Sequence, residues 1–156
     1  MTEGLPLRRA VSADAAAVRD LTRSAYAKWV ALIGREPTPM TADYDRAVVE
    51  HIVELWEEDG QLLGLIEVIP AAALLLIENI AVRPDQQGKG IGGKLLLHAE
   101  GLARSLGLND TQLYTNAAFA SNLSFYSRRG YQEFRRGTVV PGSVTVYMAK
   151  KLEAQS

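Results

Sequence analysis

The 156-residue sequence contains no cysteine and only two histidines, His51 and His98. Disulfides, cysteine-ligated metals and thiol nucleophiles are therefore excluded, whereas the redox compartment stays open. The two histidines are too few and too far apart in the sequence to form a recognisable metal-binding motif. We therefore expect a protein that holds no metal ion.

An excess of charge and long apolar stretches are also missing. The formal net charge is −1, so no overall basic field exists to hold nucleic acid or an anionic membrane. The longest apolar run, residues 71–77, is far shorter than the ~20 residues that a membrane-spanning helix needs. The N-terminus also lacks the pattern of a signal peptide. We expect a soluble, cytoplasmic protein with neither nucleic acid nor a membrane as its partner.

The sequence does contain enough apolar residues for a core. Hydrophobic residues make up 47% of the chain, which argues against disorder. At this length a single domain is expected, and we assign residues 1–156 to it.

Hydrophobic periodicity predicts seven strands. They are expected at residues 5–9, 51–57, 62–69, 74–82, 112–115, 131–138 and 144–151. Asp59-Gly60 and Pro141-Gly142 are typical of hairpin turns between neighbouring strands. Residues 74–82 are almost continuously apolar, which is typical of a central strand that is covered on both faces.

Four helices are expected between these strands. The candidate caps are Ser12 or Asp14 for a helix that ends near residue 29, Thr41 or Asp43 for a short helix, and Ser121 or Asn122 for a helix over residues 123–129. The remaining helix carries an apolar stripe at Ile91, Leu95, Ala99, Leu102 and Leu106 and ends at Gly107. Pro37 and Pro39 exclude regular structure between residues 33 and 44.

This order of elements predicts an α+β fold. A helical crossover joins the strand at residues 74–82 to the strand at residues 112–115, which gives one parallel pair. We expect a central mixed sheet of about seven strands, mostly antiparallel, flanked by about four helices. Strands and helices do not alternate regularly, as they would in a doubly wound nucleotide-binding fold.

A glycine-rich turn between the central strand and the long helix is the most informative stretch. Gly88, Gly90, Gly92 and Gly93 fall within six residues. A turn of this kind exposes backbone N–H groups at the positive end of the helix dipole, where phosphate binds readily. The turn fits three motif patterns on spacing alone.

Two of the three patterns fail on their own requirements. A P-loop needs Ser or Thr after its lysine to hold Mg²⁺, but Leu95 follows Lys94 here. The dinucleotide fingerprint needs an acidic residue that closes the next strand, whereas Asp110 would open it. The element order argues against both independently.

The third pattern resembles the acetyl-coenzyme A signature of the GNAT superfamily of N-acetyltransferases. Two motifs carry the resemblance, IAVRPDQQGKGIGGKLL at residues 80–96 and NLSFYSRRGY at residues 122–131. The element order resembles the same fold over nearly the whole chain. The resemblance implies acetyl-CoA as cosubstrate, no metal, and direct transfer of the acetyl group to the primary amine of an acceptor.

The resemblance also implies which residues bind the cofactor. In that family the strand before the turn splays from the next strand and its backbone pairs with pantetheine, while the turn amides hold the pyrophosphate. Gln87 stands where many members have Arg. The implied cofactor-binding residues are Ile80, Ala81, Val82, Gln87, Gly88, Lys89, Gly90, Ile91, Gly92, Gly93 and Asn122.

Two residues are predicted to be catalytic. By its position in the second motif, Tyr126 would protonate the coenzyme A thiolate that leaves, although it also fits a tyrosine packed in the core. A free lysine amine has a pKa of ~10.4, so a base must help to deprotonate it. Glu78 is the first candidate because alternation puts it on the strand face of Ile80 and Val82. Glu67 and His51 are weaker candidates.

Three questions stay open at this point. The acceptor is not identified, and the aromatic residues Tyr26, Trp29 and Tyr44 around residues 33–44 fit either a core anchor or an acceptor-binding wall. A non-catalytic coenzyme A-binding sensor or interaction module, or an ATP-binding protein, is the alternative to an enzyme. Exposed strand edges are compatible with a homodimer.

Overall fold

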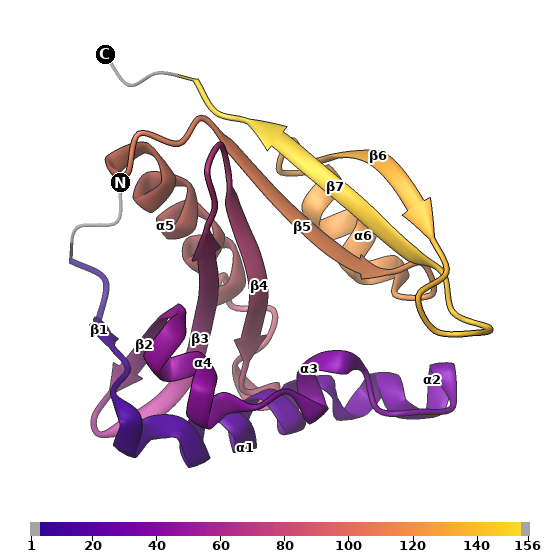
Figure 1. Cartoon of the computed structure of the whole chain (residues 1–156). Helices are drawn as coiled ribbons and strands as arrows, with labels where there is room; N and C mark the ends of the chain where they lie inside the picture. The colour runs from indigo at the N-terminus through magenta and orange to yellow at the C-terminus, as the bar shows by residue number, and fades with distance from the viewer. Residues whose placement is uncertain (1–3, 154–156) are drawn as a thin grey trace.

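The computed structural model describes residues 4–153 as a seven-stranded mixed sheet with helices on both faces (Figure 1). The sheet order is β1-β2-β3-β4-β5-β7-β6, and the β4–β5 pair is the parallel one. The predicted α+β fold and its single parallel pair are thereby confirmed. The strands are β1 (Leu7–Arg9), β2 (Ile52–Glu58), β3 (Gln61–Pro70), β4 (Leu75–Val82), β5 (Asp110–Asn116), β6 (Gln132–Gly137) and β7 (Thr145–Lys151).

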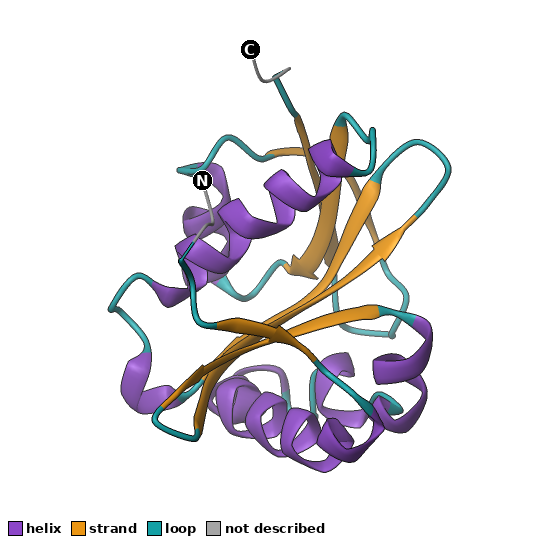
Figure 2. Cartoon of the chain, turned by 90° about the vertical axis from the view of Figure 1, so that its left-hand side faces the viewer, coloured by secondary structure: helices purple, strands orange, loops and turns teal. Residues whose placement is uncertain are grey.

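Two groups of helices cover opposite faces of the sheet (Figure 2). One core cluster lies under α1 and α4, and the other lies under α5 with α6 beside it. Strand β4 contributes to both clusters, so it is central and covered on both faces as predicted. The helices are α1 (Ala15–Tyr26), α2 (Val30–Ile33), α3 (Thr38–Thr41), α4 (Tyr44–Glu50), α5 (Ile91–Ser105) and α6 (Ala120–Ser127).

Helix α1 follows its predicted pattern. Its buried residues are Ala15, Val18, Leu21, Thr22 and Ala25. The Asp14 carboxylate accepts a hydrogen bond from the Val11 backbone N–H at 2.8 Å and two more from the Arg8 guanidinium. These bonds fix the entry of the chain into the helix.

Three sequence predictions about helices were wrong. Helix α3 forms within residues 33–44 because Pro39 falls in its first turn, where the missing N–H has no helical partner anyway. Leu106 is 47% exposed because α5 ends at Ser105 and Gly107 turns left-handed. Helix α6 begins at Ala120, so neither Ser121 nor Asn122 caps it. Instead, the Asn116 side chain accepts from the Ala118 N–H at 2.8 Å in the preceding turn.

Strands β4 and β5 separate along their length, as the resemblance implied. They pair only over Leu75–Ile77 and Thr111–Leu113, and no pairing follows. Figure 1 shows the two halves of the sheet diverging from this shared end. The backbone of β4 beyond Ile77 therefore has a free edge that faces the opening between the halves.

A β-bulge in β4 lies at the start of this opening. Glu67 pairs with Asn79 and Val68 pairs with Ile77, so Glu78 is the extra residue. The bulge breaks the simple alternation on which we had placed Glu78 on the face of Ile80 and Val82. Ile77 packs in the cluster under α5, whereas Asn79 bonds to residues of α1 and α4.

No helix within residues 4–153 has the length and apolar character that crossing a membrane requires.

Candidate active site

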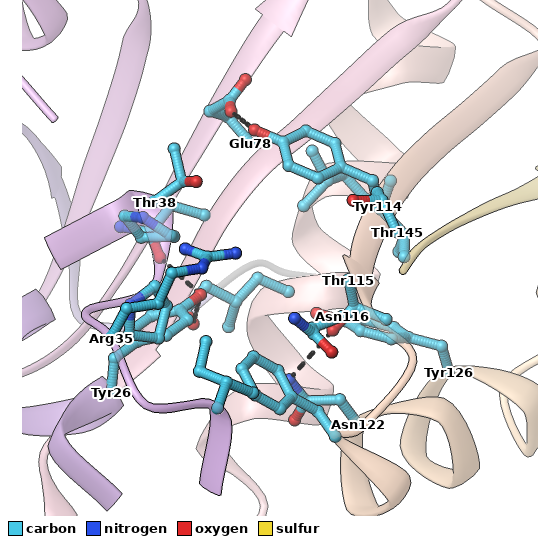
Figure 3. A pocket seen from close by; sticks show the side chains of 18 residues that line it. Tyr26, Arg35, Thr38, Glu78, Tyr114, Thr115, Asn116, Asn122, Tyr126 and Thr145 are labelled. Carbon is cyan, nitrogen blue, oxygen red and sulfur yellow. Dashed lines mark hydrogen bonds between the residues drawn. The ribbon is translucent and has the colours of Figure 1, made fainter. Parts of the chain in front are cut away.

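Three cavities lie in a row where β4 and β5 diverge. The glycine-turn cavity, about 590 Å³, borders residues 86–93 and α6, and the central cavity of about 80 Å³ adjoins it. These two share Tyr26, Ile80, Asn122 and Tyr126. The acidic cavity, about 320 Å³, lies beyond the central one and shares with it Thr38, Pro39, Glu78, Asn79 and Tyr114. Figure 3 shows the central cavity with side chains from both halves of the sheet around it.

The glycine turn has the geometry of an anion site. Gly88 and Gly90 have φ values of +79° and +90°, a left-handed conformation that favours glycine. The first helical hydrogen bond joins Lys94 N to Gly90 O at 3.1 Å. The backbone N–H groups of Ile91 to Gly93 precede it and have no helical partner, so they are available to an anionic ligand.

The free edge of β4 presents alternate residues to the opening. Arg83 N donates to Leu63 O at 2.8 Å, so residues 81 and 83 direct their backbone groups toward β3. Ile80 and Val82 direct theirs the other way and line the glycine-turn cavity. The Ala81 side chain is buried at 1% exposure. Of the three residues that the resemblance implicates, Ile80 and Val82 are the two that a bound strand could reach.

Most of the predicted cofactor-binding residues line one cavity. The glycine-turn cavity includes Ile80, Val82, Gln87, Gly88, Gly90, Ile91, Gly92, Gly93 and Asn122. Ala81 and Lys89 are not among its lining residues. Asn122 donates weakly to Thr115 Oγ1 at 3.4 Å and lies between this cavity and the central one.

Three cations outside the predicted cofactor-binding set also line this cavity. They are Lys28, Arg128 and Arg129. Lys28 Nζ donates to Gln87 Oε1 at 2.9 Å, and Gln87 Nε2 donates to Val82 O at 3.0 Å. A lysine from the segment after α1 thus brings positive charge to the position where the family often carries an arginine.

Tyr126 lies where the glycine-turn and central cavities meet. Its ring packs against Phe125 and Tyr131 at centroid distances of 5.1 and 6.0 Å. Burial raises the pKa of the Tyr126 hydroxyl to about 12. The hydroxyl is therefore neutral at physiological pH and can donate a hydrogen bond into the cavity.

Glu78 lines both the central and the acidic cavities. The Tyr114 hydroxyl donates a hydrogen bond to Glu78 Oε1. Burial, followed by this hydrogen bond and the charge of Glu78, raises the pKa of Tyr114 well above its ordinary value. Tyr114 therefore stays a donor and orients the Glu78 carboxylate, which keeps its second oxygen for another partner.

The acidic cavity contains the two weaker base candidates as a pair. His51 Nδ1 lies 2.6 Å from Glu67 Oε2, and Glu67 is 3% exposed. Burial raises the pKa of Glu67, and the hydrogen bond from His51 opposes that rise. The acidic side chains that line the cavity are Asp43, Glu50, Glu67 and Glu78. Its basic side chains are His51 and Arg46, and Arg46 pairs with Glu50 at 2.9 Å.

A network around the buried Asn79 holds the helices over the cavities. Asn79 Nδ2 donates to Thr22 Oγ1 at 3.1 Å, and its Oδ1 accepts from the Tyr26 hydroxyl at 3.0 Å. The Tyr44 hydroxyl donates to Pro39 O at 2.6 Å. Tyr44 is therefore a core anchor that also borders the acidic cavity, and Tyr26 is part of the wall between the other two cavities.

An aromatic stack bridges the two halves of the site. The rings of Trp29 and Phe119 are stacked at 4.2 Å with an 18° interplanar angle. Sequence reasoning identified Trp29 only as one of an aromatic cluster and missed Phe119, Tyr114, Asn79 and Arg35. These residues belong to no contiguous motif, so no local signal marks them.

Residues 4–153 contain no group of three or more His, Asp and Glu side chains arranged to hold a metal ion.

Comparisons with known proteins agree that the chain resembles acetyltransferases. The acetyltransferase (GNAT) family matches residues 16–131. Streptothricin acetyltransferase of Streptomyces lavendulae is 33% identical over 99 residues, which cover 58% of this chain and 52% of that protein. Spermidine N(1)-acetyltransferase of Thermoplasma acidophilum is 30% identical over 74 residues, covering 47% of this chain and 46% of that protein. The matches thus span about half the length of these curated relatives.

A solved structure shares the fold over nearly the whole chain. PaiA N-acetyltransferase from Thermoplasma acidophilum, in complex with coenzyme A, matches with a TM-score of 0.78 and 20% identity. The match covers 95% of this chain and 99% of the other.

Proposed function

Because this chain belongs to the acetyltransferase (GNAT) family, we propose that it transfers the acetyl group of acetyl-CoA directly to a primary amine. Residues 1–156 act as one N-acetyltransferase domain in this proposal. The observation that carries it is the placement of Tyr126 and Glu78. Tyr126 lies between the glycine-turn and central cavities, and Glu78 lies between the central and acidic cavities. A hydroxyl donor and a carboxylate thus border the same central cavity. The hydroxyl lies toward the glycine-turn cavity, and the carboxylate lies toward the acidic cavity.

The residues of the glycine-turn cavity fit coenzyme A chemically. Its pyrophosphate carries negative charge, which suits the N–H groups that begin α5 and the cations Lys28, Arg128 and Arg129. Its pantetheine arm contains amides, which suit the backbone N–H groups of Ile80 and Val82, whereas the carbonyls of these residues already accept from Tyr26 and Gln87. Acetyl-CoA as cosubstrate supplies the acetyl group as a thioester.

The acceptor amine must be deprotonated before it can react. At pH 7 only about one alkylamine in 10³ is neutral. Glu78 accepts the ammonium proton through the carboxylate oxygen that Tyr114 does not occupy. The amine nitrogen then attacks the thioester carbonyl carbon, and the carbon–sulfur bond breaks. The second proton of the amine nitrogen then passes to the thiolate, so the products are an amide and the coenzyme A thiol.

Tyr126 stabilises the thiolate that leaves. A thiol with a pKa of about 8.5 is a stronger acid than an ordinary tyrosine. Burial widens this difference, because it raises the pKa of Tyr126 to about 12. Complete proton transfer from Tyr126 is therefore unfavourable. A hydrogen bond to the developing negative charge is favourable and lowers the barrier.

The acidic cavity supports an acceptor with positive charge. Four carboxylates line it against two basic side chains. Arg46 is paired with Glu50 and His51 with Glu67, which leaves Asp43 and Glu78 without a basic partner among the lining residues. The relatives named for streptothricin and spermidine support the same choice, because spermidine is a polyamine. We therefore propose a small cationic amine, rather than an anionic molecule, as the acceptor class.

A thiol-release assay with purified protein and acetyl-CoA tests this function. Diamines and polyamines should release coenzyme A faster than monoamines of the same length, and the preference should weaken at high salt. Calorimetry in parallel should show binding of acetyl-CoA and none of Mg²⁺-ATP. Tight acetyl-CoA binding with no turnover on any amine would favour a coenzyme A sensor, and tight ATP binding would reject the proposal.

A further inference from the structure

The central cavity contains one charged group that the proposed chemistry leaves unused. Of the residues that line it, Arg35 and Glu78 are the charged ones, and they have opposite signs. Figure 3 shows them entering from different walls, with the Arg35 guanidinium directed into the space between. Glu78 has a role as the base, whereas Arg35 has none.

The donors of Arg35 are largely without partners. Its Nε is buried and has no hydrogen-bond partner within residues 4–153. Its Nη1 donates to the backbone carbonyl of Glu36 at 3.2 Å. A buried donor without an acceptor is unfavourable, so such groups in native proteins usually await a ligand or a water.

The nearest carboxylate in sequence is not available to Arg35. Glu36 forms an ion pair with Arg23 of α1 at 2.5 Å. Arg23 also donates to the Met40 backbone carbonyl at 2.8 Å. These two contacts hold residues 36–40 against α1 and keep the counter-ion directed away from the cavity.

The coenzyme A site is not the natural partner of Arg35. Arg35 does not line the glycine-turn cavity, which has its own cations in Lys28, Arg128 and Arg129. Arg35 instead lines the central cavity together with Glu78, the proposed base. A guanidinium presents two parallel N–H groups that match a carboxylate bidentately.

We propose that Arg35 binds a carboxylate of the acceptor, so that the acceptor is a basic amino acid or a closely related zwitterion. The reacting amine lies toward Glu78, the carboxylate lies toward Arg35, and a further ammonium group extends into the acidic cavity. This inference rests on the proposed function and narrows its acceptor class. It also explains why a cavity for a cationic molecule contains an unpaired arginine.

Matched acceptor pairs test the inference. L-lysine with cadaverine, L-ornithine with putrescine, and L-alanine with ethylamine each differ by one carboxylate. In the thiol-release assay the acid of a pair should have a kcat/KM about tenfold or more above that of its amine, as a charged hydrogen bond permits. The preference should be largest for the diamino acids.

Variants of Arg35 identify the side chain responsible. Arg35→Gln should raise the KM for the preferred acid about tenfold or more, with little change for its decarboxylated partner or for acetyl-CoA. Arg35→Lys should restore part of the loss, because a lysine keeps the charge but not the bidentate geometry. Arg136→Gln, on the exposed β6 strand, is the matched control and should behave as wild type.

Calorimetry with the coenzyme A-loaded protein separates this inference from the proposed function. Binding of L-lysine that requires Arg35, without turnover on any amine, would uphold the carboxylate site and reject the transferase. Turnover on amines without a preference for the acids, or an equal loss for both members of each pair in Arg35→Gln, would overturn the carboxylate site alone. Absence of Arg35-dependent binding for all three acids would overturn it as well.

Discussion

The cavities at the two ends of the site differ both in charge and in how the chain builds them. The charged side chains that line the glycine-turn cavity are Lys28, Arg128 and Arg129, whereas Asp43, Glu50, Glu67 and Glu78 line the acidic cavity. The first suits an anionic cosubstrate, and the second suits a cationic acceptor. Opposite potentials on either side of one small cavity would bring the two substrates in from opposite ends.

The cavities at the two ends also differ in how widely their lining residues are spread along the sequence. The glycine-turn cavity takes nine of its 19 lining residues from residues 80–93, one continuous stretch, and the others from residues 25–29 and 121–129. The acidic cavity depends on side chains from the segment before α4, from α4 itself and from β3, β4 and β5. In the proposed function, backbone groups of the glycine turn would hold the cosubstrate, and side chains that can change independently would select the acceptor.

Replacement of the base should have the largest effect. In Glu78→Gln we expect kcat/KM at pH 7 to fall about 100-fold or more, because proton transfer contributes on this scale. Acetyl-CoA affinity should not change, since Glu78 lines only the central and acidic cavities. The deficit should shrink as the pH rises and more amine becomes neutral.

Steady-state kinetics across pH, with calorimetry for acetyl-CoA, provide the measurement. Glu133→Gln on the exposed β6 strand is the control. A variant as active as wild type at pH 7 would transfer the role of base to another group, with the Glu67–His51 pair as the next candidate.

Distortion of the glycine turn should weaken acetyl-CoA binding at the opposite end of the site from Glu78. In Gly90→Val, a β-branched residue must adopt a φ of +90°, which strains the backbone and moves the N–H groups. We expect acetyl-CoA affinity to fall about 10- to 100-fold. Gly142→Val is a matched control, because Gly142 has a φ of +82° in the β6–β7 turn, away from the cavities. Equal affinity in Gly90→Val and wild type would reject the turn as the pyrophosphate site.

Tyr126 lies at the boundary between the glycine-turn and central cavities. Loss of its hydroxyl should have an intermediate effect on the rate. In Tyr126→Phe we expect kcat to fall about tenfold, with unchanged coenzyme A affinity. Since burial raises the pKa of Tyr126 to about 12, the hydroxyl stays neutral from about pH 6 to pH 9. The ratio of wild-type to variant kcat should therefore be flat over this range. Tyr147→Phe on β7 serves as the control, and an unaltered kcat in Tyr126→Phe would exclude the hydroxyl from the reaction.

A change in the scaffold should leave both ends functional and have the smallest effect. Asp14→Asn removes charge-assisted hydrogen bonds before α1 and should lower the free energy of unfolding by about 1 kcal/mol at pH 7. Hydrogen bonds from Arg8 and then from Val11 N lower the pKa of Asp14 to about 2. Its contribution is therefore complete above its ordinary pKa and disappears as the pH falls through about 2.

Urea unfolding at pH 7 and at low pH measures this difference. The wild-type advantage over Asp14→Asn should disappear under acid, while turnover at pH 7 stays the same in both. A stability gap that persists unchanged under acid would contradict the assigned carboxylate role.

Local patterns were sufficient for much of the fold. The buried face of α1, the hairpin at Asp59-Gly60 and the cap at Asp43 all follow from short-range rules. The Asp43 carboxylate accepts from Arg46 N at 3.2 Å. Such features depend on groups a few residues apart, so the sequence contains all the information that specifies them.

The wrong predictions share a different cause. Leu106 fits the stripe of α5 by spacing, but the chain leaves the helix at Ser105 before that residue can pack. Helix α6 begins earlier than expected because the preceding turn is closed by Asn116. Alternation alone did not show the bulge opposite Glu67 and Val68, in which Glu78 is the extra residue, although Glu78 does line the central cavity together with Ile80. In each case a backbone detail that hydrophobic spacing does not encode decided the outcome: the left-handed Gly107, the turn at Asn116 or the β-bulge.

The sequence by itself determined the family, the order of elements along the chain and the stretch that we propose for the cosubstrate end of the site. This is because the glycine turn and the strand before it would bind their ligand through contiguous backbone, which a short motif can encode. Only the tertiary structure decided the acceptor end. The separation of β4 from β5 brings Arg35, Glu78 and Tyr126 to one cavity, although they lie far apart along the chain. Side chains gathered from distant segments have no spacing rule, so their chemistry becomes visible only once the chain has folded.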